Sequence, residues 1–366
     1  MSEARIAVDA RPLCYPGTGI GRYTHELLYR LCRMGGQWFL YAHQHYDRDP
    51  FDLPNVHHRS AGLPAAMRGS QLGQLLFPYW ARRDRVQALW GPRHQLPPML
   101  SAGIRTVLTM HDLVWKEYGD TMRFPGRQVE DFMTPRALAR ADVIAVVSQF
   151  TQQRLKHYFP QYAHKVTVVP GASMLEMTNS RDLFTPLPQQ EKYLLFVGTL
   201  EPRKNLGRLL RAYKRYLSSA SQARRLKIVG GDGWGGESIE GLLSELSLTN
   251  EVELLGKVDE KALRNLYLGA YALLMPSLYE GFGLPVVEAL SVGVPVITSR
   301  NSAMSEVAGG SGLYVDPYSE DEIWQALMTI CENHGQYASL VQRSFGEAGR
   351  YSWGSSAATM ADLLFR

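Results

Sequence analysis

Short apolar runs alternate along the chain with longer segments whose apolar residues recur at helical spacing. The apolar runs are rich in β-branched residues and cover positions 6–8, 106–108, 143–147, 166–169, 193–197, 226–229, 272–275 and 295–298. Runs without polar alternation suit strands that are buried on both faces, and helices between them predict parallel sheets built from βαβ units. We therefore expect an α/β protein.

This alternation pauses once, between residues 170 and 192, where prolines, glycine and glutamines replace the periodic pattern. We predict a first Rossmann-like domain over residues 1–173, a linker over 174–191 and a second Rossmann-like domain over 192–350. Residues 351–366 form a C-terminal helix that folds back on the first domain. Two open parallel sheets joined in this way leave a cleft, and ligands bind beyond the carboxyl ends of the strands.

The composition is that of an ordinary globular protein, with 366 residues, 45% hydrophobic and 20% charged. No uncharged apolar run approaches the roughly 18 residues that a membrane-spanning helix needs. A strand-like run comes directly after the N-terminus, so we expect no secretory signal. Cys14, Cys32 and Cys331 lie too far apart for a disulfide framework or a zinc site, and a reducing cytoplasm fits them best.

Charge is spread unevenly. Residues 1–173 hold 21 Lys and Arg against 13 Asp and Glu, a net charge of +8, whereas residues 174–366 hold 18 against 22, a net charge of −4. The surplus in the first half is mostly arginine. It can face phosphate groups, on a membrane surface or on a phosphorylated acceptor, or it can be a solvated surface of biased composition.

One segment of the basic half combines apolar and cationic residues. Leu72, Leu75, Leu76, Tyr79 and Trp80 have helical spacing, and three arginines follow at positions 82, 83 and 85. This pattern fits a peripheral membrane-surface element at the inner face of the cell membrane, and it also fits a core helix with a charged end.

The strongest chemical pattern is the string Glu-Gly-Phe-Gly-Leu-Pro-Val-Val-Glu at positions 280–288, which follows the apolar run 272–275 after the short segment 276–279. The two glycines predict a loop, and Leu284 begins a helix with a proline in its first turn, where the missing N–H costs nothing. The free N–H groups of that turn make an anion site. Glu280 and Glu288 flank this site, so one carboxylate can bind a sugar and the other a ribose, a diphosphate length away.

This string resembles the signature of retaining glycosyltransferases with the GT-B fold, of the group 1 (family 4) type. The resemblance implies two Rossmann-like domains that face each other across a cleft, the first binding the acceptor and the second the nucleotide-sugar. It implies that Glu280 binds a hydroxyl of the transferred sugar and that Glu288 binds the ribose hydroxyls. It places backbone groups of four residues on the sugar and diphosphate: Phe282, Gly283, Leu284 and Val286.

A second string, Gly-Thr-Leu-Glu-Pro-Arg-Lys-Asn-Leu at 198–206, follows the run 193–197 and opens a predicted helix. The helix macrodipole disfavours cations at that point, and an anion nearby resolves the conflict. This string resembles the same family, which places Arg203 and Lys204 on the donor diphosphate and Gly198 in the donor site. Fixed cations stabilise a departing diphosphate as its charge develops.

With these cations on the diphosphate, no metal is needed. An Asp-x-Asp triplet of the kind that holds a divalent ion does occur, at Asp47 and Asp49. It lies in a polar stretch with no strand before it, so we interpret it as a loop. We expect no metal and no cofactor, with the nucleotide-sugar as a co-substrate.

The first domain carries a glycine loop at 17–21, which follows the first strand and opens a helix but lacks the third glycine of a dinucleotide site. In the family this loop lines the cleft; Gly19 would face the donor, and Gly21 and Arg22 the acceptor. With the string Val-Asp-Ala-Arg-Pro-Leu at 8–13, it resembles bacterial mannosyl- and rhamnosyltransferases of surface polysaccharide (O-antigen) biosynthesis. That resemblance favours GDP-mannose or GDP-rhamnose as donor and a glycan or lipid-diphosphate-linked acceptor.

Two further positions complete the expected site. His111 and Asp112 follow the strand at 106–110, and the family carries such a pair facing the donor sugar. We assign His111 to positioning the sugar or phosphate, leave a general-base role open, and place Asp112 on the acceptor side. The backbone at Val258, between a strand at 251–254 and a helix, would contact the base.

Other functions stay open at this point. A nucleotide-sugar epimerase can share the GT-B fold. The string Gly-Asp-Gly-Trp-Gly-Gly at 231–236 follows a strand and fits the dinucleotide pattern, so it favours a nicotinamide-dependent enzyme unless it is only a structural turn. A non-catalytic membrane-binding module would need the basic stretch alone. No contact with nucleic acid is expected.

Overall fold

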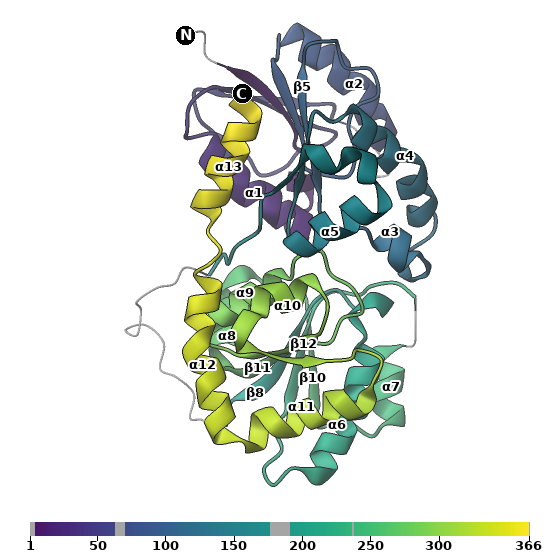
Figure 1. Ribbon diagram of the computed structural model, residues 1–366, viewed down its shortest axis with the longest axis vertical. Coiled ribbons are helices and arrows are strands. Elements are labelled where there is room, and N and C mark those ends of the chain that lie inside the picture. The colour runs from purple at the N-terminus through teal and green to yellow at the C-terminus, as the bar shows by residue number, and fades with distance from the viewer. Residues whose placement is uncertain (1–3, 63–69, 176–190, 236–237, 366) are drawn as a thin grey trace. The chain divides into compact units, whose positions relative to one another are not determined.

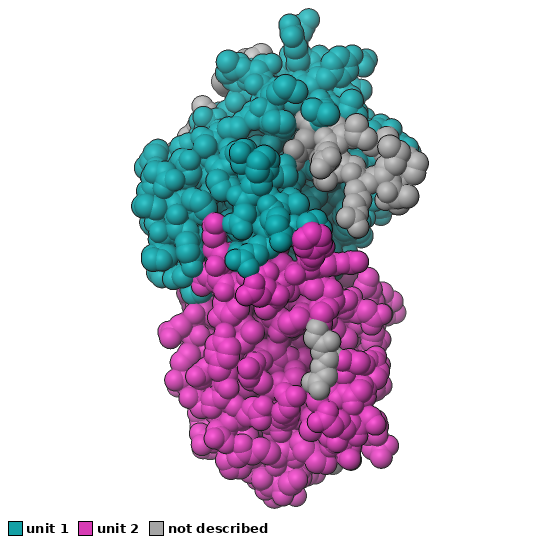
Figure 2. Space-filling model, turned by 90° about the vertical axis from the view of Figure 1, so that its right-hand side faces the viewer, with its two compact units in different colours: residues 1–115, 125–171, 352–366 teal, residues 116–124, 172–351 magenta. Residues whose placement is uncertain are grey.

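The computed structural model describes residues 4–62, 70–175, 191–235 and 238–365, and within residues 70–74 only the backbone. The chain divides into two compact units, coloured separately in Figure 2. Unit 1 comprises Met1–Trp115, Pro125–Gly171 and Ser352–Arg366, and unit 2 comprises Lys116–Phe124 and Ala172–Tyr351. The linker expected at 174–191 lies almost entirely outside the described residues.

Unit 1 contains a seven-stranded parallel sheet in the order β3-β2-β1-β4-β5-β6-β7 (Figure 1). The strands are β1 (Arg5–Asp9), β2 (Gln37–Ala42), β3 (Val56–Ser60), β4 (Ala88–Gly91), β5 (Arg105–Met110), β6 (Val143–Val146) and β7 (Val166–Val168). Its helices are α1 (Gly19–Leu31), α2 (Ser70–Arg83), α4 (Gly126–Arg140), α5 (Gln149–Tyr158) and α13 (Trp353–Phe365), with α3 (Val114–Glu117) at the boundary to unit 2. Strand order reverses between β1 and β4, which makes this the switch point where open sheets bind ligands.

Unit 2 contains a six-stranded parallel sheet in the order β10-β9-β8-β11-β12-β13. The strands are β8 (Tyr193–Val197), β9 (Leu226–Val229), β10 (Val252–Gly256), β11 (Ala270–Met275), β12 (Val296–Ser299) and β13 (Gly312–Val315). Its helices are α6 (Leu206–Ser219), α7 (Ile239–Glu245), α8 (Glu260–Gly269), α9 (Leu284–Ser291), α10 (Ala303–Ala308), α11 (Glu320–Glu332) and α12 (His334–Ala348). Here the switch point lies between β8 and β11. The parallel α/β architecture that the hydrophobic pattern predicted is therefore present in both units.

The C-terminal helix α13 belongs to unit 1, where it packs along α1 (Figure 1). The Nε of Arg105 donates to the carbonyl of Leu363 at 2.7 Å, and the hydroxyl of Ser356 donates to the carbonyl of Pro170 at 2.8 Å. The Phe365 ring meets the edge of Trp38 with ring centroids 6.1 Å apart. These contacts tie the end of the chain to the core of unit 1.

Four strands were not predicted from the sequence. Strand β3 has only one buried residue, Val56, and β4 and β13 have four residues each, whereas the unbroken apolar run 38–42 of β2 was overlooked. The first domain was also drawn too widely, because Lys116–Phe124 belongs to unit 2. In that unit the indole of Trp234 donates to the carbonyl of Thr121 at 2.9 Å, and Tyr118 lies against Tyr279 with ring centroids 5.6 Å apart.

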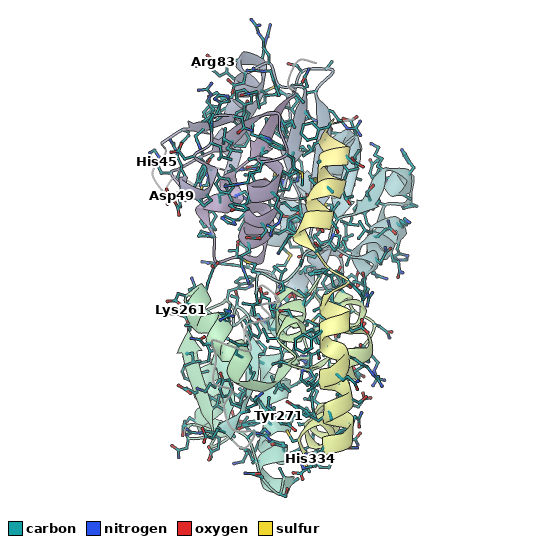
Figure 3. The ribbon with its side chains drawn as sticks, turned by 90° about the vertical axis from the view of Figure 1, so that its left-hand side faces the viewer. His45, Asp49, Arg83, Lys261, Tyr271 and His334 are labelled. Atoms are coloured by element: carbon teal, nitrogen blue, oxygen red, sulfur yellow. The ribbon has the colours of Figure 1, made fainter. Side chains whose placement is uncertain are left out.

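The amphipathic segment of the basic half forms the helix α2 as predicted, with Pro78 inside it. Phe77 and Ala81 are buried, but Leu75 and Tyr79 expose 54% and 62% of their surface. Arg83 ends the helix and reaches outward from unit 1 (Figure 3). Among the described residues, no helix is both long enough and apolar enough to cross a bilayer.

Candidate active site

The two adjacent cations of unit 2 lie in a short 3₁₀ turn, Pro202–Lys204, that follows β8. The α-helix α6 begins only at Leu206, after Asn205 in the left-handed conformation with φ 61°. The prediction that Arg203 and Lys204 stand at the start of an α-helix is therefore wrong by one turn. The left-handed residue bends the chain and turns both cations back toward the carboxyl edge of the sheet.

Asn205 fixes this turn to its surroundings. Its side-chain amide donates to the carbonyl of Pro276, directly after β11, at 2.9 Å, and to the carbonyl of Pro317 at 2.6 Å. The N–H of Leu278 donates to the carbonyl of Arg203 at 2.8 Å. The turn after β8 and the loop after β11 are thus joined by backbone and side-chain hydrogen bonds at the switch point of the sheet.

Glu280 lies between the two cations. Arg203 Nη1 donates to Glu280 Oε2 at 2.7 Å, and Lys204 Nζ donates to Glu280 Oε1 at 2.5 Å. Arg203 also donates to the carbonyl of Tyr279 at 2.7 Å and pairs with Glu201. The four charged residues form one connected cluster in which each side chain is at most 16% exposed.

The cluster fixes the charge of Glu280. Burial alone would raise the pKa of this carboxyl, but the charges and hydrogen bonds of Arg203 and Lys204 outweigh burial and lower the pKa to about 2. Glu280 is therefore an ionised acceptor at neutral pH, with lone pairs for hydroxyl groups beyond the two cations.

The glycines near this cluster make room for it. A Cβ on Gly198 would lie 3.4 Å from Cε of Lys204, so the lysine stem runs directly over this residue. A Cβ on Gly230 would come within 1.8 Å of the carbonyl of Gly198, and one on Gly233 within 1.9 Å of the carbonyl of Leu200. The loop after β9 is thus pressed against the loop after β8.

This packing explains the dinucleotide-like string at 231–236, of which Gly236 lies outside the described residues. Leu200 donates to the carbonyl of Gly231 at 3.1 Å, and Leu200 and Asp232 form an isolated parallel bridge. Gly233, together with Gly230 just before the string, is needed for close backbone approach to the cation-bearing loop. The string therefore has a structural role, which is the alternative to a dinucleotide site that the sequence left open.

Helix α9 begins at Leu284 with Pro285 in its first turn, as predicted, and Gly283 before it adopts φ 106°. One expectation fails here: the N–H of Val286 donates to the carbonyl of Gly283 at 2.9 Å and is not available to an anion. In the described part of the chain, the N–H groups of Phe282, Gly283 and Leu284 have no acceptor. The Phe282 ring packs edge-on against Tyr351, with ring centroids 5.3 Å apart.

Glu288 lies on α9, inside unit 2. Its side chain is fully buried, and its carboxylate accepts a hydrogen bond of 2.9 Å from the hydroxyl of Tyr267. A buried carboxylate needs such partners, because an unpaired buried charge is costly. In unit 2 Glu288 is thus held by Tyr267, and its contact with the ribose stays a prediction. Val258 lies half-buried in the loop between β10 and α8, where Asp259 caps α8.

In unit 1, His111 follows β5 and is held by its backbone and its ring. Its ring Nε2 donates to the carbonyl of Pro92 at 2.8 Å, so the neutral ring carries its proton on Nε2 and Nδ1 is unprotonated. Its N–H donates to Nε2 of His94 at 3.0 Å. Burial and the neighbouring His94 lower the pKa of His111 to about 3. A base this weak is poorly matched to proton transfer at neutral pH, so the geometry favours positioning over general-base catalysis.

The remaining predicted residues of unit 1 lie around α1 and α3. Asp112 accepts from the N–H of Val114 at 3.1 Å and so caps the short helix α3. Gly19 begins α1, and Gly21 lies in its first turn, where a Cβ would come within 2.3 Å of the carbonyl of Tyr15. Arg22 is half-buried in the same turn. These residues share the carboxyl edge of the sheet through β1 and β5.

The Asp-x-Asp triplet lies elsewhere. Asp49 and His45 stand at the outer surface of unit 1 (Figure 3), and Asp47 accepts from the N–H of Asp49 at 3.1 Å. No group of three or more His, Cys, Asp or Glu side chains suited to a metal ion occurs among the residues with described placement.

Several residues that shape the site were missed from the sequence. Glu201 and Asn205 lie inside the string 198–206, so the sequence showed that they are near the two cations. It did not show which groups they bind. Tyr267 and His94 carry no motif, and only the fold brings them to Glu288 and His111.

Comparison with known proteins matches both units. The family "Glycosyltransferase Family 4" matches residues 17–172, and "Glycosyl transferases group 1" matches residues 182–350. The O-antigen chain mannosyltransferase B of Escherichia coli is 30% identical over 378 residues, covering 95% of this chain and 96% of that protein. The O-antigen chain mannosyltransferase RfbU of Salmonella typhimurium is 27% identical, covering 71% of this chain and 68% of its own.

Solved structures share the fold. Sucrose-phosphate synthase from Thermosynechococcus elongatus superposes with a TM-score of 0.77 at 21% identity, covering 98% of both chains. WaaG, a glycosyltransferase involved in lipopolysaccharide biosynthesis, superposes with a TM-score of 0.76 at 14% identity, covering 98% of this chain and 99% of that one. These similarities show the GT-B fold that the motifs predicted.

Proposed function

Because the chain belongs to the group 1, family 4 glycosyltransferases, we propose that its cluster of Arg203, Lys204 and Glu280 holds a nucleotide diphosphate sugar and releases the sugar to an acceptor. The transferred sugar is a hexose or deoxyhexose, and the acceptor is a glycan or a lipid-linked oligosaccharide. The observation that carries this proposal is the pairing of both cations with one ionised carboxylate at the switch point of unit 2.

Each member of the cluster has a distinct task. The two cations neutralise the diphosphate, and the charge that develops on it during bond cleavage strengthens the interaction in the transition state. Glu280 accepts hydrogen bonds from sugar hydroxyls, because its low pKa keeps it ionised. The N–H groups of Phe282, Gly283 and Leu284 add donors at the start of α9.

We propose further that transfer proceeds with retention and without a metal. Both cations and the helix start supply positive potential where a divalent ion would otherwise act. In a same-face displacement the leaving phosphate takes the acceptor proton, which agrees with a His111 that is too weakly basic to do so. Its neutral ring positions the sugar or phosphate.

The proposed donor is GDP-mannose, with GDP-rhamnose as the second choice. Support comes from the two O-antigen mannosyltransferases that resemble this chain. Thermal shift with GDP, UDP, ADP and dTDP, each with and without EDTA, tests base and metal use together. GDP should stabilise the protein most, equally in both conditions; stabilisation that requires a divalent ion would contradict the metal-free proposal.

Contact with a membrane surface is proposed for α2. The exposed side chains of Leu75 and Tyr79 stand one turn apart, and Arg82 and Arg83 follow them. Apolar residues beside cations suit an anionic lipid surface. Sedimentation with vesicles of phosphatidylglycerol and phosphatidylethanolamine should recover the wild type, and the double substitution Leu75→Ser, Tyr79→Ser should leave most of it in solution. Equal recovery of both would contradict this contact.

A further inference from the structure

The switch point of unit 1 gathers charged side chains from several strands. Asp9 ends β1, His43 follows β2, Arg93 and His94 follow β4, and His111 follows β5. Because these four strands are neighbours in the order β2-β1-β4-β5, the residues that follow them meet at one edge of the sheet.

The ion pair between Arg11 and Asp9 leaves neither oxygen of the Asp9 carboxylate without a partner. Arg11 and Asp9 are both buried; Asp9 Oδ1 accepts from Nε of Arg11 at 2.8 Å, and Oδ2 accepts from Nη2 at 2.6 Å. The N–H of Arg11 donates to the same carboxylate at 3.1 Å. Asp9 is thus occupied by Arg11 on both of its oxygens.

The second carboxylate at this edge, that of Glu130, is also paired with neighbouring side chains. Glu130 on α4 lies 3.3 Å from Nδ1 of His94 and accepts from the hydroxyl of Thr134 at 2.6 Å, both through Oε2. Since Nε2 of His94 accepts from the N–H of His111, the proton of His94 lies on Nδ1 and faces Glu130. Glu130 therefore holds the histidine that supports the His111 backbone.

Arg93 stands between these two pairs without a partner of its own. It is half-buried, and its guanidinium forms no hydrogen bond or ion pair with any residue in 4–62, 70–175, 191–235 or 238–365 whose side chain is described; only its backbone carbonyl is paired, with the N–H of Gln95 at 2.7 Å. Burial and the charge of Arg11 lower the pKa of Arg93, and the carboxylates of Asp9 and Glu130, each paired with another residue, offset this only in part. A guanidinium that is desolvated beside another guanidinium is costly unless an anion compensates it.

His43 and Tyr15 supply further polar atoms beside Arg93. His43 is buried, and its Nδ1 has no partner among the described residues. Its Nε2 lies 3.5 Å from the hydroxyl of Tyr15, a residue that exposes 50% of its surface. Arg93 interacts electrostatically with both side chains. The edge thus offers an arginine fork, an imidazole nitrogen and a phenol hydroxyl, with Tyr15 reaching solvent.

We propose that Arg93, His43 and Tyr15 form a binding site for a phosphate group, which, on the proposed glycosyltransferase function, is the phosphate of the acceptor. An arginine fork matches two oxygens of a phosphate, and the imidazole and phenol groups donate to the others. The phosphate belongs to a sugar phosphate or to a lipid diphosphate, which share this chemistry. Such a site explains why Arg93 is half-buried without an ion pair, whereas the neighbouring carboxylates Asp9 and Glu130 are both paired.

Phosphate binding is measured at His43 itself, without any need for turnover. Protein labelled with ¹⁵N-histidine is titrated with inorganic phosphate at constant pH, and the His43 signals are assigned by their absence in His43→Gln. We expect a saturable shift in the wild type and in the control Arg48→Gln, which removes an exposed arginine of the same unit. In Arg93→Gln the shift should be lost, and Arg93→Lys should weaken binding. No shift in the wild type, or an equal shift in Arg93→Gln, would overturn the site.

Transfer assays then identify the source of the phosphate. Methyl α-mannoside, mannose 1-phosphate and mannose linked through diphosphate to a short polyprenol are compared as acceptors. Arg93→Gln should raise KM about tenfold or more for one or both phosphate-bearing acceptors, with KM for methyl mannoside and for the donor unchanged. An equal loss with all three acceptors, or no loss with any, would overturn the assignment to the acceptor. If the wild type transfers no sugar at all, the proposed function fails, while the histidine titration still decides the phosphate site.

Discussion

Lys204 donates a 2.5 Å hydrogen bond to the carboxylate of Glu280, although 76 positions separate the two residues in the chain. The contact joins the loop after β8 to the loop after β11, and Arg203 completes it from the other side of the carboxylate. Positive and negative side-chain charges are therefore balanced in one cluster. This balance makes the cluster sensitive to changes in either sign of charge.

Lowering the pH should reduce the free energy of unfolding of unit 2, because it protonates Glu280. Its pKa in the folded protein is about 2 against an ordinary value of 4.5, so its stabilising effect is complete above about pH 4.5 and is lost as the pH falls toward 2. The shift corresponds to about 3 kcal/mol at most. Urea unfolding of the wild type and Glu280→Gln should show a gap in unfolding free energy that narrows below pH 4.5. A gap that stays constant from pH 7 to pH 3 would show that the carboxylate is not paired in this way.

Gly233→Ala should damage the cation-bearing loop. Its Cβ would lie 1.9 Å from the carbonyl of Leu200, so the backbone next to Glu201 must shift. Such overpacking costs about 1–3 kcal/mol, and we expect a lower Tm together with weaker nucleotide binding. The matched control is Gly346→Ala in α12, where nothing lies within 4 Å and the change should stabilise or leave Tm unchanged. Equal Tm values for both variants would refute the close packing.

Tyr267→Phe should separate a structural role of Glu288 from a ribose contact. The substitution leaves a buried carboxylate one hydrogen bond short, which costs about 1–3 kcal/mol. Tm should fall. The KM for the donor should stay within about twofold of the wild-type value, because the tyrosine hydroxyl contacts Glu288 and not the donor. Glu288→Gln should behave alike. A large rise in nucleotide Kd in Glu288→Gln at unchanged Tm would instead support the predicted ribose contact.

The pH dependence of turnover tests His111. Because its pKa lies near 3, it stays neutral throughout the range in which the protein works, and kcat/KM should show no acid limb near pH 6.5. His111→Gln should lower the rate at every pH by a similar factor. An acid limb near pH 6.5 that disappears in His111→Gln would instead identify it as a general base.

The sequence allowed the fold class and the proximity of three charged motif residues to be predicted, because strands buried on both faces leave apolar runs and the motifs follow these runs. It placed Arg203, Lys204 and Glu280 in one site, since their loops follow strands that proved to be neighbours. It could not show that the three side chains pair with one another, because pairing depends on the left-handed turn at Asn205 and on Asn205's bond to Pro276.

Other features depended on packing that no local pattern encodes. Spacing put Glu288 one turn into a helix but could not tell which face of α9 is buried. Strand β4 has only four residues and the edge strand β3 only one buried residue; neither was predicted, so the switch point of unit 1, with Arg93 and His94 after β4, was not foreseen.

The most direct test is the steady-state transfer kinetics of Glu280→Gln, which keeps the side-chain shape and removes the charge. Glu245→Gln, on the exposed surface of α7, is the matched control. We predict that kcat/KM for the donor falls by about 100-fold or more in Glu280→Gln, equivalent to about 3 kcal/mol of transition-state stabilisation, and is unchanged in Glu245→Gln, with both variants folded by circular dichroism. Wild-type kcat/KM in a folded Glu280→Gln would contradict the assignment of this cluster as the donor site.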